Sequence, residues 1–264
     1  MSEPVLPTAV PPRATRLHAG PPRWLLPILV MVVGFALVHP FDGPLAARAS
    51  HLAASMPRDL RRELFAWQQY GQATAIIVAA LIVWLLDPTR RRRLLDLVLA
   101  LLIAQLVSTS AKLLIGRPRP RPEFNDPTTF LSPWGKYPIT INGKPTLVHA
   151  WDTGANTDLW SMPSSHTLFA AVLSVFLACL YPGLRWLALA LALLVGFGRV
   201  LFDAHWPTDV IVGAAAGWLI ARSIIPTFAG VRTLDWLWTR LVNRRALPAF
   251  PTMFAAESAR AAKP

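Results

Sequence analysis

Six long apolar runs dominate this chain and limit the folds that it can adopt. They are Trp24–Phe41, Trp67–Leu86, Leu94–Ile115, Thr167–Tyr181, Leu184–Phe202 and Val210–Ile225. Only 15% of the 264 residues are charged, whereas soluble domains carry about 25%. A lone helix needs about 20 apolar residues to cross a bilayer, and a bundle tolerates the runs that are shorter. The sequence therefore predicts an all-α, polytopic membrane protein built on a bundle of six transmembrane helices.

Basic residues set the orientation that we expect for this bundle. Four arginines at 90–93 lie in the short link between the second and third runs, and such links stay in the cytoplasm. Both termini are then cytoplasmic, and the links after the first, third and fifth runs face outward. These outer links are residues 42–66, 116–166 and 203–209. The first of them carries four arginines, although basic residues are usually enriched on the cytoplasmic side. They are Arg48, Arg58, Arg61 and Arg62.

The chain divides into a tail, a membrane domain and a second tail. Residues 1–23 are rich in proline, alanine and arginine, so we expect a disordered cytoplasmic tail. Residues 24–225 hold the six runs, with the large outer loop 116–166 between the third and the fourth. Residues 226–264 form a second cytoplasmic tail. Leu25–Val38 could instead serve as a cleavable signal peptide, but its removal would leave an odd number of spans, so we favour an uncleaved first helix.

Two local patterns lie outside the apolar runs. An Asn-Gly pair separates Tyr137–Ile141 from Thr146–Val148, which predicts a small β-hairpin in the large outer loop. In the C-terminal tail, Trp236 and Trp238 stand among leucines beside Arg240, a pattern typical of an amphipathic helix that lies on a membrane. We expect this helix on the inner leaflet.

Composition narrows the classes of partner. A net charge of +12 would suit nucleic acid, but the cations lie in loops and tails beside the apolar runs, as orientation signals and phosphate ligands do. We therefore expect no nucleic-acid partner. Cys179 is the one cysteine, which excludes a disulfide or a thiolate metal site within the chain. The sequence shows no carboxylate cluster suited to Mg²⁺, so we expect no metal and no cofactor.

Three polar segments at the outer ends of the expected helices supply reactive groups. They are Lys112-x6-Arg119-Pro120, Pro163-Ser164-Ser165-His166 and Arg199-x5-His205-x3-Asp209. Phosphoryl transfer mainly needs positioning and stabilisation of charge on three equatorial oxygens. The segments offer cations, histidines, a carboxylate and a hydroxyl, which suits removal of a phosphoryl group through a phosphohistidine without a metal.

The histidines and serines of these segments stand where helices are expected to begin. The carboxylate of Asp209 lies four residues after His205, so it can reach one ring nitrogen and leave the other free to attack phosphorus. Ser164 and Ser165 precede the fourth run, where free N–H groups make a seat for an anion, although serines there are also ordinary N-caps. The pairing of His166 with a second histidine favours a catalytic role over that of an interfacial side chain.

The cations stand where a charge needs a partner. Lys112 and Arg199 lie near the outer ends of apolar runs, where a cation is costly without an anion or water. Snorkelling to the interface is the structural alternative for Lys112. Asp203 is expected to be either a local partner of Arg199 or a solvated acid.

The segment Gly116–Pro122 alternates arginine with proline, which excludes a helix. Its arginines therefore project from an extended chain and cannot all face one ligand. By its spacing from the preceding lysine, Arg119 is the expected phosphate ligand. Arg117 and Arg121 are expected to bind loop carboxylates, backbone carbonyls or lipid head groups.

Taken together, the three segments resemble the signature of the type 2 phosphatidic acid phosphatase superfamily. That signature reads Lys-x6-Arg-Pro, Pro-Ser-Gly-His and Ser-Arg-x5-His-x3-Asp, and the resemblance extends from Lys112 to Asp209 in the correct order. Two positions depart from it, since Ser165 replaces the glycine and Gly198 replaces the serine. Neither departure removes a charged or nucleophilic group.

The resemblance implies a role for each site residue. His205 would be the nucleophile, Asp209 would orient it, and His166 would protonate the leaving oxygen. The groups that hold the phosphate would be Lys112, Arg119, Ser164, Arg199 and the backbone of Ser165. The implied protein is a metal-independent phosphatase of a lipid phosphate or diphosphate, in a bacterial inner membrane, with its site facing the periplasm or exterior.

Other functions stay open at the level of sequence. A phosphotransferase of the same superfamily would use the same residues and pass the phosphoryl group to another lipid. A vanadate-dependent haloperoxidase shares this kind of site, but six spans argue against it. A non-catalytic lipid transporter or scaffold would not need both histidines and the carboxylate. The sequence leaves open the lipid among undecaprenyl diphosphate, phosphatidylglycerophosphate, phosphatidate and lipid A, and it leaves open the oligomeric state.

Overall fold

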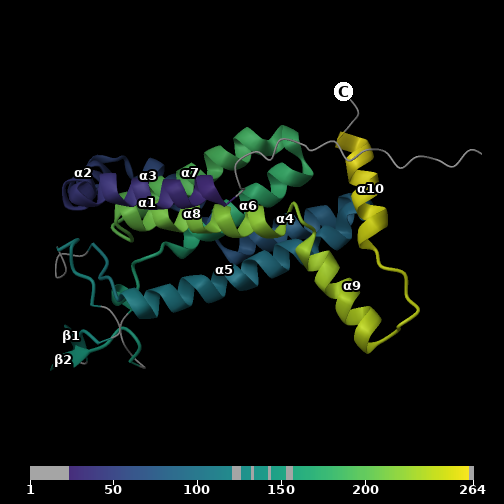
Figure 1. Cartoon of the computed structure of the whole chain (residues 1–264). Helices are drawn as coiled ribbons and strands as arrows, with labels where there is room; N and C mark the ends of the chain where they lie inside the picture. The colour runs from purple at the N-terminus through teal and green to yellow at the C-terminus, as the bar shows by residue number, and fades with distance from the viewer. Residues whose placement is uncertain (1–23, 121–125, 132–133, 142–143, 153–156, 262–264) are drawn as a thin grey trace, which may run out of the picture.

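The computed structural model describes residues 24–120, 126–131, 134–141, 144–152 and 157–261 as a helical bundle with a small hairpin at one end (Figure 1). The main helices are α1 Leu25–Val38, α2 Asp42–Ser55, α3 Arg58–Trp67, α4 Ala73–Leu86, α5 Leu94–Ile115, α6 Ser165–Leu180, α7 Arg185–Leu201, α8 Pro207–Ile224, α9 Ala229–Leu241 and α10 Phe250–Ala261. Short 3₁₀ turns link several of them: η1 His39–Phe41, η2 Gln68–Gly71, η3 Pro88–Arg93, η5 Thr157–Leu159 and η6 Pro182–Leu184.

Helix α6 lies at the centre of the bundle. It packs against α5, α7 and α8, and its side chains are buried around most of its circumference, among them Leu168, Val172, Leu173 and Phe176. A helix that is apolar all round is expected in such a central place. The first turn of α6 carries Ser165 and His166, so the helix with the most complete burial is also the one that holds part of the expected site.

Two glycines bring α8 into direct contact with α6. A side-chain carbon on Gly213 would lie 2.5 Å from the carbonyl oxygen of Ser164, and one on Gly217 would lie 2.3 Å from that of Leu168. Any larger residue would force the two backbones apart. Small residues four apart are a common basis of close helix contact in membranes. This contact sets the start of α8, with His205 just before it, beside the start of α6.

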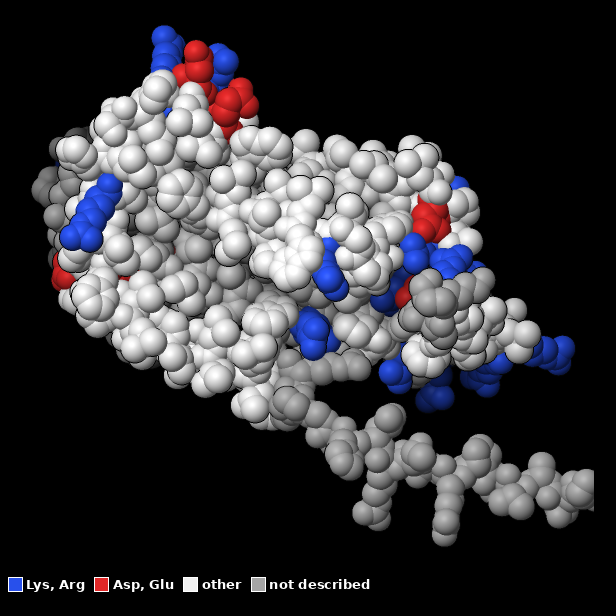
Figure 2. Space-filling view, turned by 90° about the horizontal axis from the view of Figure 1, so that it is seen from above, with Lys and Arg blue, Asp and Glu red and all other residues white. Residues whose placement is uncertain are grey.

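The outer surface of the bundle is apolar. Leu37, Leu85, Leu106 and Leu193 are each more than three-fifths exposed. Figure 2 shows a broad uncharged area over the middle of the molecule, with most of its charged side chains gathered toward the ends. A soluble protein rarely exposes a continuous apolar area of this kind, and together with the apolar helices it marks an integral membrane protein.

All six predicted apolar runs are helical. That all six cross the membrane stays a prediction. Judged by length and composition among the described residues, three helices can cross a membrane: Leu25–Ser55, Pro88–Ile115 and Pro182–Leu201. The number reaches five if two bent pairs each count as one span, α3–η2 with α4 at 61° and α8 with α9 at 48°. Helix α6, with 16 residues, is shorter than these.

Two boundaries differ from the sequence prediction. The second run was expected to start at Trp67, but that residue ends α3, and α4 begins only at Ala73 after the turn η2. The polar residues of η2 are used for contacts with α6 and α7, which breaks the helix there. The expected loop 42–66 is also mostly helical, because it contains α2 and α3.

The predicted hairpin in the long connection is confirmed. Strand β1, Tyr137–Ile141, pairs antiparallel with β2, Lys144–Val148, and the register places Tyr137 opposite Val148. The second strand begins two residues earlier than expected. Its two turn residues, 142 and 143, lie outside the described part of the chain. Val148 packs with Leu159 in a small apolar cluster that gives this region its own core.

Beyond α8 the chain forms two more helices. Helix α9 buries Gly230 and Val231 at its start, whereas Trp236 and Trp238 are at least half exposed. Helices α9 and α10 lie at the opposite end of the bundle from the hairpin (Figure 1). The predicted tail 1–23 lies outside the described residues.

Candidate active site

The expected nucleophile and its acid lie at the start of α8. His205 and Asp209 are 1% and 0% exposed, and 3.7 Å separates His205 Nδ1 from Asp209 Oδ2. The same carboxylate oxygen accepts hydrogen bonds from the Trp206 backbone N–H at 2.9 Å and from the Ser161 hydroxyl. Pro207 occupies the first turn, which suits a residue without an N–H. Nδ1 of His205 therefore faces the carboxylate, and Nε2 is the nitrogen left for chemistry.

Burial sets the protonation state of the expected nucleophile. Desolvation lowers the pKa of His205 to about 3, and the nearby Arg119 and Arg199 act in the same direction, while Asp209 opposes them. The ring is thus neutral at neutral pH. A neutral imidazole has a free lone pair, which an attacking nitrogen needs.

Arg117 holds this carboxylate in place from the other side. Its side chain is fully buried, and its Nη1 donates to Asp209 Oδ1 at 2.7 Å and to the Thr208 hydroxyl at 2.8 Å. Its Nη2 donates to Asp42 Oδ2 at 2.7 Å and to the Pro127 carbonyl at 2.8 Å. The expectation that Arg117 binds carboxylates and carbonyls is confirmed, but its link to the catalytic acid was not foreseen. Arg121, treated together with it, lies outside the described residues.

Asp42 is a site residue that sequence reasoning missed. It is fully buried at the start of α2 and accepts the Thr208 backbone N–H at 3.0 Å as well as the guanidinium of Arg117. His39 Nδ1 lies 3.1 Å from the same carboxylate. One signal could have found it, because an acid at the end of an apolar run is costly unless it has a partner.

Lys112 and Ser165 meet at the end of α5. The Lys112 ammonium donates to the Ser165 hydroxyl at 2.5 Å, and the Ser108 hydroxyl lies 2.8 Å from the same oxygen. Gly116, with φ of 58°, ends α5 in a left-handed conformation that glycine adopts readily. Sequence reasoning used only the backbone of Ser165, whereas the structure adds a contact of its hydroxyl with the lysine.

Ser164 and Arg119 bind the surrounding backbone. The Ser164 N–H donates to the Asp209 carbonyl at 3.0 Å, and its buried hydroxyl lies 3.0 Å from that of Thr167. Ser164 stands at the N-cap position of α6, but its side chain makes no capping hydrogen bond. Arg119 donates its N–H to the Asp158 carbonyl at 2.7 Å and its Nε to the Thr157 carbonyl at 3.1 Å.

His166 and Arg199 both contact the turn between α3 and α4. Nε2 of His166 lies 2.8 Å from the side-chain amide nitrogen of Gln72. Arg199 Nη1 donates to Gln68 Oε1 at 3.1 Å. The suggestion that Asp203 partners Arg199 is wrong, because Asp203 instead accepts a hydrogen bond from the hydroxyl of Ser50 at 3.0 Å.

The structure brings all eight expected site residues into one cluster. Ser165 contacts Lys112, Ser164 bonds to Asp209, and Asp209 faces His205. His166 interacts electrostatically with Lys112, Arg119 and Arg199. Within the described ranges, no group of three His, Cys, Asp or Glu side chains is placed to hold a metal ion.

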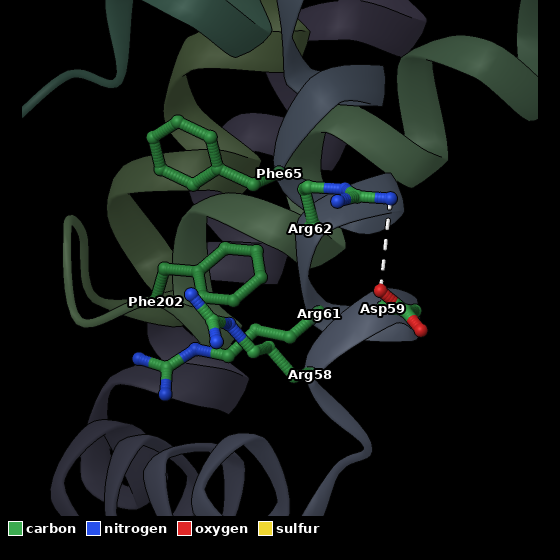
Figure 3. Close-up of a pocket in the computed structure, with 6 residues that line it drawn as sticks. All are labelled: Arg58, Asp59, Arg61, Arg62, Phe65 and Phe202. Carbon is green, nitrogen blue, oxygen red and sulfur yellow. Dashed lines mark ion pairs between the residues drawn. The ribbon is translucent and has the colours of Figure 1, made fainter.

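A surface hollow lies near this cluster but is distinct from it. Figure 3 shows side chains of α3 facing Phe202, the residue after α7. The lining residues are Arg58, Asp59, Arg61, Arg62, Phe65 and Phe202, so none of the eight expected site residues lines it. Asp59 pairs with Arg62 at 3.6 Å, and the Arg61 guanidinium carbon lies 5.9 Å from the centre of the Phe202 ring.

Comparisons with known proteins identify relatives by sequence and by fold. A curated relative, an undecaprenyl-diphosphatase of Sulfolobus acidocaldarius, is 29% identical over 157 residues, which are 59% of this chain and 63% of that protein. The chain therefore matches somewhat less than two thirds of the length of that relative. The crystal structure of a transmembrane PAP2 type phosphatidylglycerolphosphate phosphatase from Bacillus subtilis has the same fold, with a TM-score of 0.52 and 19% identity over 78% of this chain and 95% of that one.

A family model gives the most direct assignment. The model of the PAP2 superfamily matches residues 93–232, which is just over half of the chain. The matched region begins at the start of α5 and ends in α9. It therefore includes all eight expected site residues. The chain belongs to the PAP2 superfamily.

Proposed function

We propose that this protein is a phosphatase that removes a phosphate from a lipid phosphate or lipid diphosphate through a phosphohistidine. The observation that carries the proposal is a buried, neutral His205 whose Nδ1 faces a carboxylate that Arg117 holds. Around it stand the cations Lys112, Arg119 and Arg199. The similarity to an undecaprenyl-diphosphatase supports the same class of substrate.

In the first step of this mechanism, His205 Nε2 attacks phosphorus while the bond from phosphorus to the leaving oxygen breaks. His166 gives its proton to that oxygen, so the lipid leaves as a neutral hydroxyl or a less charged phosphate. Asp209 stabilises the positive charge that develops on the nucleophilic ring, as carboxylates do for histidines in related chemistry. The nitrogen–phosphorus and O–H bonds form as the phosphorus–oxygen bond and the N–H bond of His166 break.

In the second step, water attacks the phosphohistidine. His166, now unprotonated, takes a proton from that water, and the nitrogen–phosphorus bond breaks to release inorganic phosphate and regenerate His205. In both steps the developing charge lies on the equatorial oxygens, where the cations and the first N–H groups of α6 can stabilise it.

The location follows from the same arrangement. The cluster lies at the end of an apolar bundle, which suits a substrate whose tail is in the membrane and whose phosphate is in water. We place this end at the outer face of a bacterial inner membrane, since the arginines at 90–93 are at the other end of α5. We also propose six spans, a cytoplasmic C-terminal tail with α9 on the inner leaflet, and no need for a metal.

The proposal is tested by phosphate release from a panel of lipids. Purified protein in detergent is given undecaprenyl diphosphate, phosphatidylglycerophosphate, phosphatidate and lipid A, with EDTA present. We expect release from at least one lipid, no loss in EDTA and inhibition by vanadate, which mimics the transition state when bound to a histidine. Phosphate that appears on an acceptor lipid would indicate a transferase, and no turnover of any lipid would refute the proposal.

The two histidines can be told apart by the leaving group. His205→Ala removes the nucleophile and should abolish turnover of every substrate. His166→Ala removes the leaving-group acid, and general acid catalysis raises the rate by about 10²–10⁴-fold. The fall in rate should be smaller on nitrophenyl phosphate, because nitrophenolate needs little protonation to leave. Rates on both substrates decide the roles, provided that both variants keep the wild-type thermal transition. Activity in His205→Ala together with none in His166→Ala would exchange the roles.

A further inference from the structure

Two glutamines from outside the three motif segments contact the site. Gln68 lies in η2 and Gln72 precedes α4, at the corner where α3–η2 and α4 meet at 61°. Gln68 is only 2% exposed, whereas Gln69 between them is exposed. The corner packs against both α6 and α7. The side-chain hydrogen bonds of these two glutamines end on Arg199 and His166, two residues of the proposed reaction.

Gln68 fills the space that the missing motif serine leaves. A side-chain carbon on Gly198 would lie 2.8 Å from Cγ and 3.1 Å from Cδ of Gln68. A serine at 198 and this position of Gln68 are therefore incompatible. From that position Gln68 Oε1 accepts the hydrogen bond of Arg199 Nη1 at 3.1 Å. The glutamine thus fixes the direction of a cation that is assigned to the phosphate.

Two buried donors at this contact have no acceptor among the described residues. They are Nε2 of Gln68 and Nε of Arg199. A buried donor without a partner is destabilising, so a site that keeps two of them close together is suited to a ligand rich in acceptors. A phosphate oxygen supplies such an acceptor.

Gln72 acts on the expected leaving-group acid. Its amide nitrogen lies 2.8 Å from Nε2 of His166. Gly71 makes this contact close, because a side-chain carbon there would lie 2.2 Å from the His166 carbonyl oxygen. The amide of Gln72 can serve both states of the ring, because its N–H donates to Nε2 of the neutral imidazole and its oxygen can accept from Nε2–H of the imidazolium. Nδ1 is then left to give the imidazolium proton to the leaving oxygen.

We propose that Gln68 and Gln72 are positioning residues, one for the phosphate-binding Arg199 and the other for the acid His166. This inference rests on the proposed function. It also accounts for the departure at Gly198, because Gln68 occupies the space that a serine side chain would need and bonds to Arg199 from there. Gln72 acts through His166. Gln68 acts through Arg199, and its unpartnered Nε2 can also donate to a phosphate oxygen.

The test uses three leucine variants of the same corner. Gln68→Leu should raise KM and weaken vanadate binding by about 10–100-fold, as loss of an orienting partner does elsewhere, on lipid and nitrophenyl phosphate alike. Gln72→Leu should lower kcat on the lipid by a similar factor and much less on nitrophenyl phosphate. Gln69→Leu is the control in the same turn and should change neither. All three must keep the wild-type thermal transition.

A double variant tests whether Gln68 compensates for the absence of a serine at position 198. Gly198→Ser alone should clash with Gln68 and raise KM. Gln68→Ala with Gly198→Ser removes the clash and restores the motif serine, so the pair should be more active than the product of the two single effects predicts. Additive effects would overturn the compensation. If Gln72→Leu lowered kcat equally on the lipid and on nitrophenyl phosphate, the role assigned to Gln72 would be overturned.

The failure of this inference can be separated from failure of the proposed function. Vanadate that binds the folded protein raises its thermal transition whether or not a lipid is turned over. A wild type that hydrolyses no lipid would refute the proposed function and the role of Gln72, while the vanadate titration of Gln68→Leu would still decide on Gln68. Equal vanadate stabilisation of wild type and Gln68→Leu would refute that part.

Discussion

The two ends of α5 carry two buried arginine–aspartate clusters that look alike and do different things. Arg93 precedes the helix and Arg117 follows it, and both side chains are almost completely buried. The 22 residues of α5 separate them by about 33 Å. Arg93 pairs with Asp96, as Arg117 pairs with Asp209 and Asp42.

The other hydrogen-bond partners of these side chains distinguish the two clusters. In the first, Arg93 Nη2 donates to the Ile225 carbonyl at 2.8 Å, and Asp96 Oδ1 accepts the N–H groups of Gly230 and Val231 at 2.7 and 3.2 Å. These are the end of α8 and the start of α9, so the cluster joins the C-terminal helices to the bundle. In the second, Asp209 Oδ2 accepts the Trp206 N–H and the Ser161 hydroxyl and also faces His205. Its last partner is a side chain that can react.

The comparison teaches that burial of an ion pair does not mark a catalytic site by itself. A buried pair carries a desolvation penalty that can exceed its Coulombic gain, and removing one partner strongly destabilises the fold in either case. The distinguishing feature is what the carboxylate holds besides the arginine. Both clusters hold backbone N–H groups, but only the carboxylate of Asp209 also faces the buried imidazole of His205.

The largest expected effect comes from matched changes of the two acids. Asp209→Asn should lower kcat by about 10⁴-fold, the loss seen when an orienting carboxylate of a catalytic histidine becomes an amide. Asp96→Asn should keep kcat per folded molecule but lose on the order of 3 kcal/mol of stability. Turnover and thermal unfolding in detergent measure both. An equal fall of kcat in Asp96→Asn would break the comparison.

Lowering the pH should destabilise the folded protein through His205, which faces Asp209 in the cluster of Arg117. Its pKa is lowered to about 3 in the folded protein and is about 6.5 when unfolded, so between these values the unfolded state binds more protons. Stability due to this group is present above about pH 6.5 and is lost as the pH falls toward 3. The thermal midpoint of wild type should therefore fall more between pH 7 and 4 than that of His205→Ala.

The same pKa has a kinetic consequence. Because His205 stays neutral well below pH 6.5, its protonation should not limit kcat/KM between pH 7 and 5. A rate that falls with an apparent pKa near 6.5 in wild type, and that keeps this pKa in His166→Ala, would contradict the assignment of a buried neutral nucleophile.

The smallest effect is expected at Ser165. Ser165→Gly restores the motif glycine and removes the hydroxyl contact with Lys112, while the backbone N–H is kept. We expect KM to rise by about twofold to tenfold, which corresponds to the net value of one hydrogen bond, with little change in kcat. Ser108→Ala removes only the second hydroxyl and should have a weaker effect. An unchanged KM in Ser165→Gly would show that the lysine is oriented without it.

Part of the site could be predicted because its geometry is local. His205 lies two residues before α8 and Asp209 lies in its first turn, so the short chain between them keeps the two side chains near each other. The hairpin of β1 and β2 follows from an Asn-Gly pair between two strand-like segments in the same way. The end of α5 at Gly116 was expected because the following prolines exclude a helix.

Other features could not be predicted because nothing local distinguishes them. Arg117, Arg119 and Arg121 alternate with prolines, and the sequence offers no reason why the first should reach Asp209. Gln68 and Gln69 are adjacent and chemically the same, yet one is buried against Arg199 and the other is exposed. The break at η2 was missed because Trp67–Leu86 reads as one apolar run.

The amino-acid sequence by itself determined the six apolar helical segments, the reactive residue types and their family. It could do so because apolar periodicity, prolines and short spacings act over a few residues. The tertiary structure decided which residues hold these groups: Arg117 and Asp42 for Asp209, Gln68 for Arg199 and Gln72 for His166. These partners come from helices far apart in the chain, and only the close packing of α8 on α6 and of the α3–α4 corner on both α6 and α7 brings them together. Burial there removes water, so each buried charge or ring must find its partner within the protein, and the packing determines which one it finds.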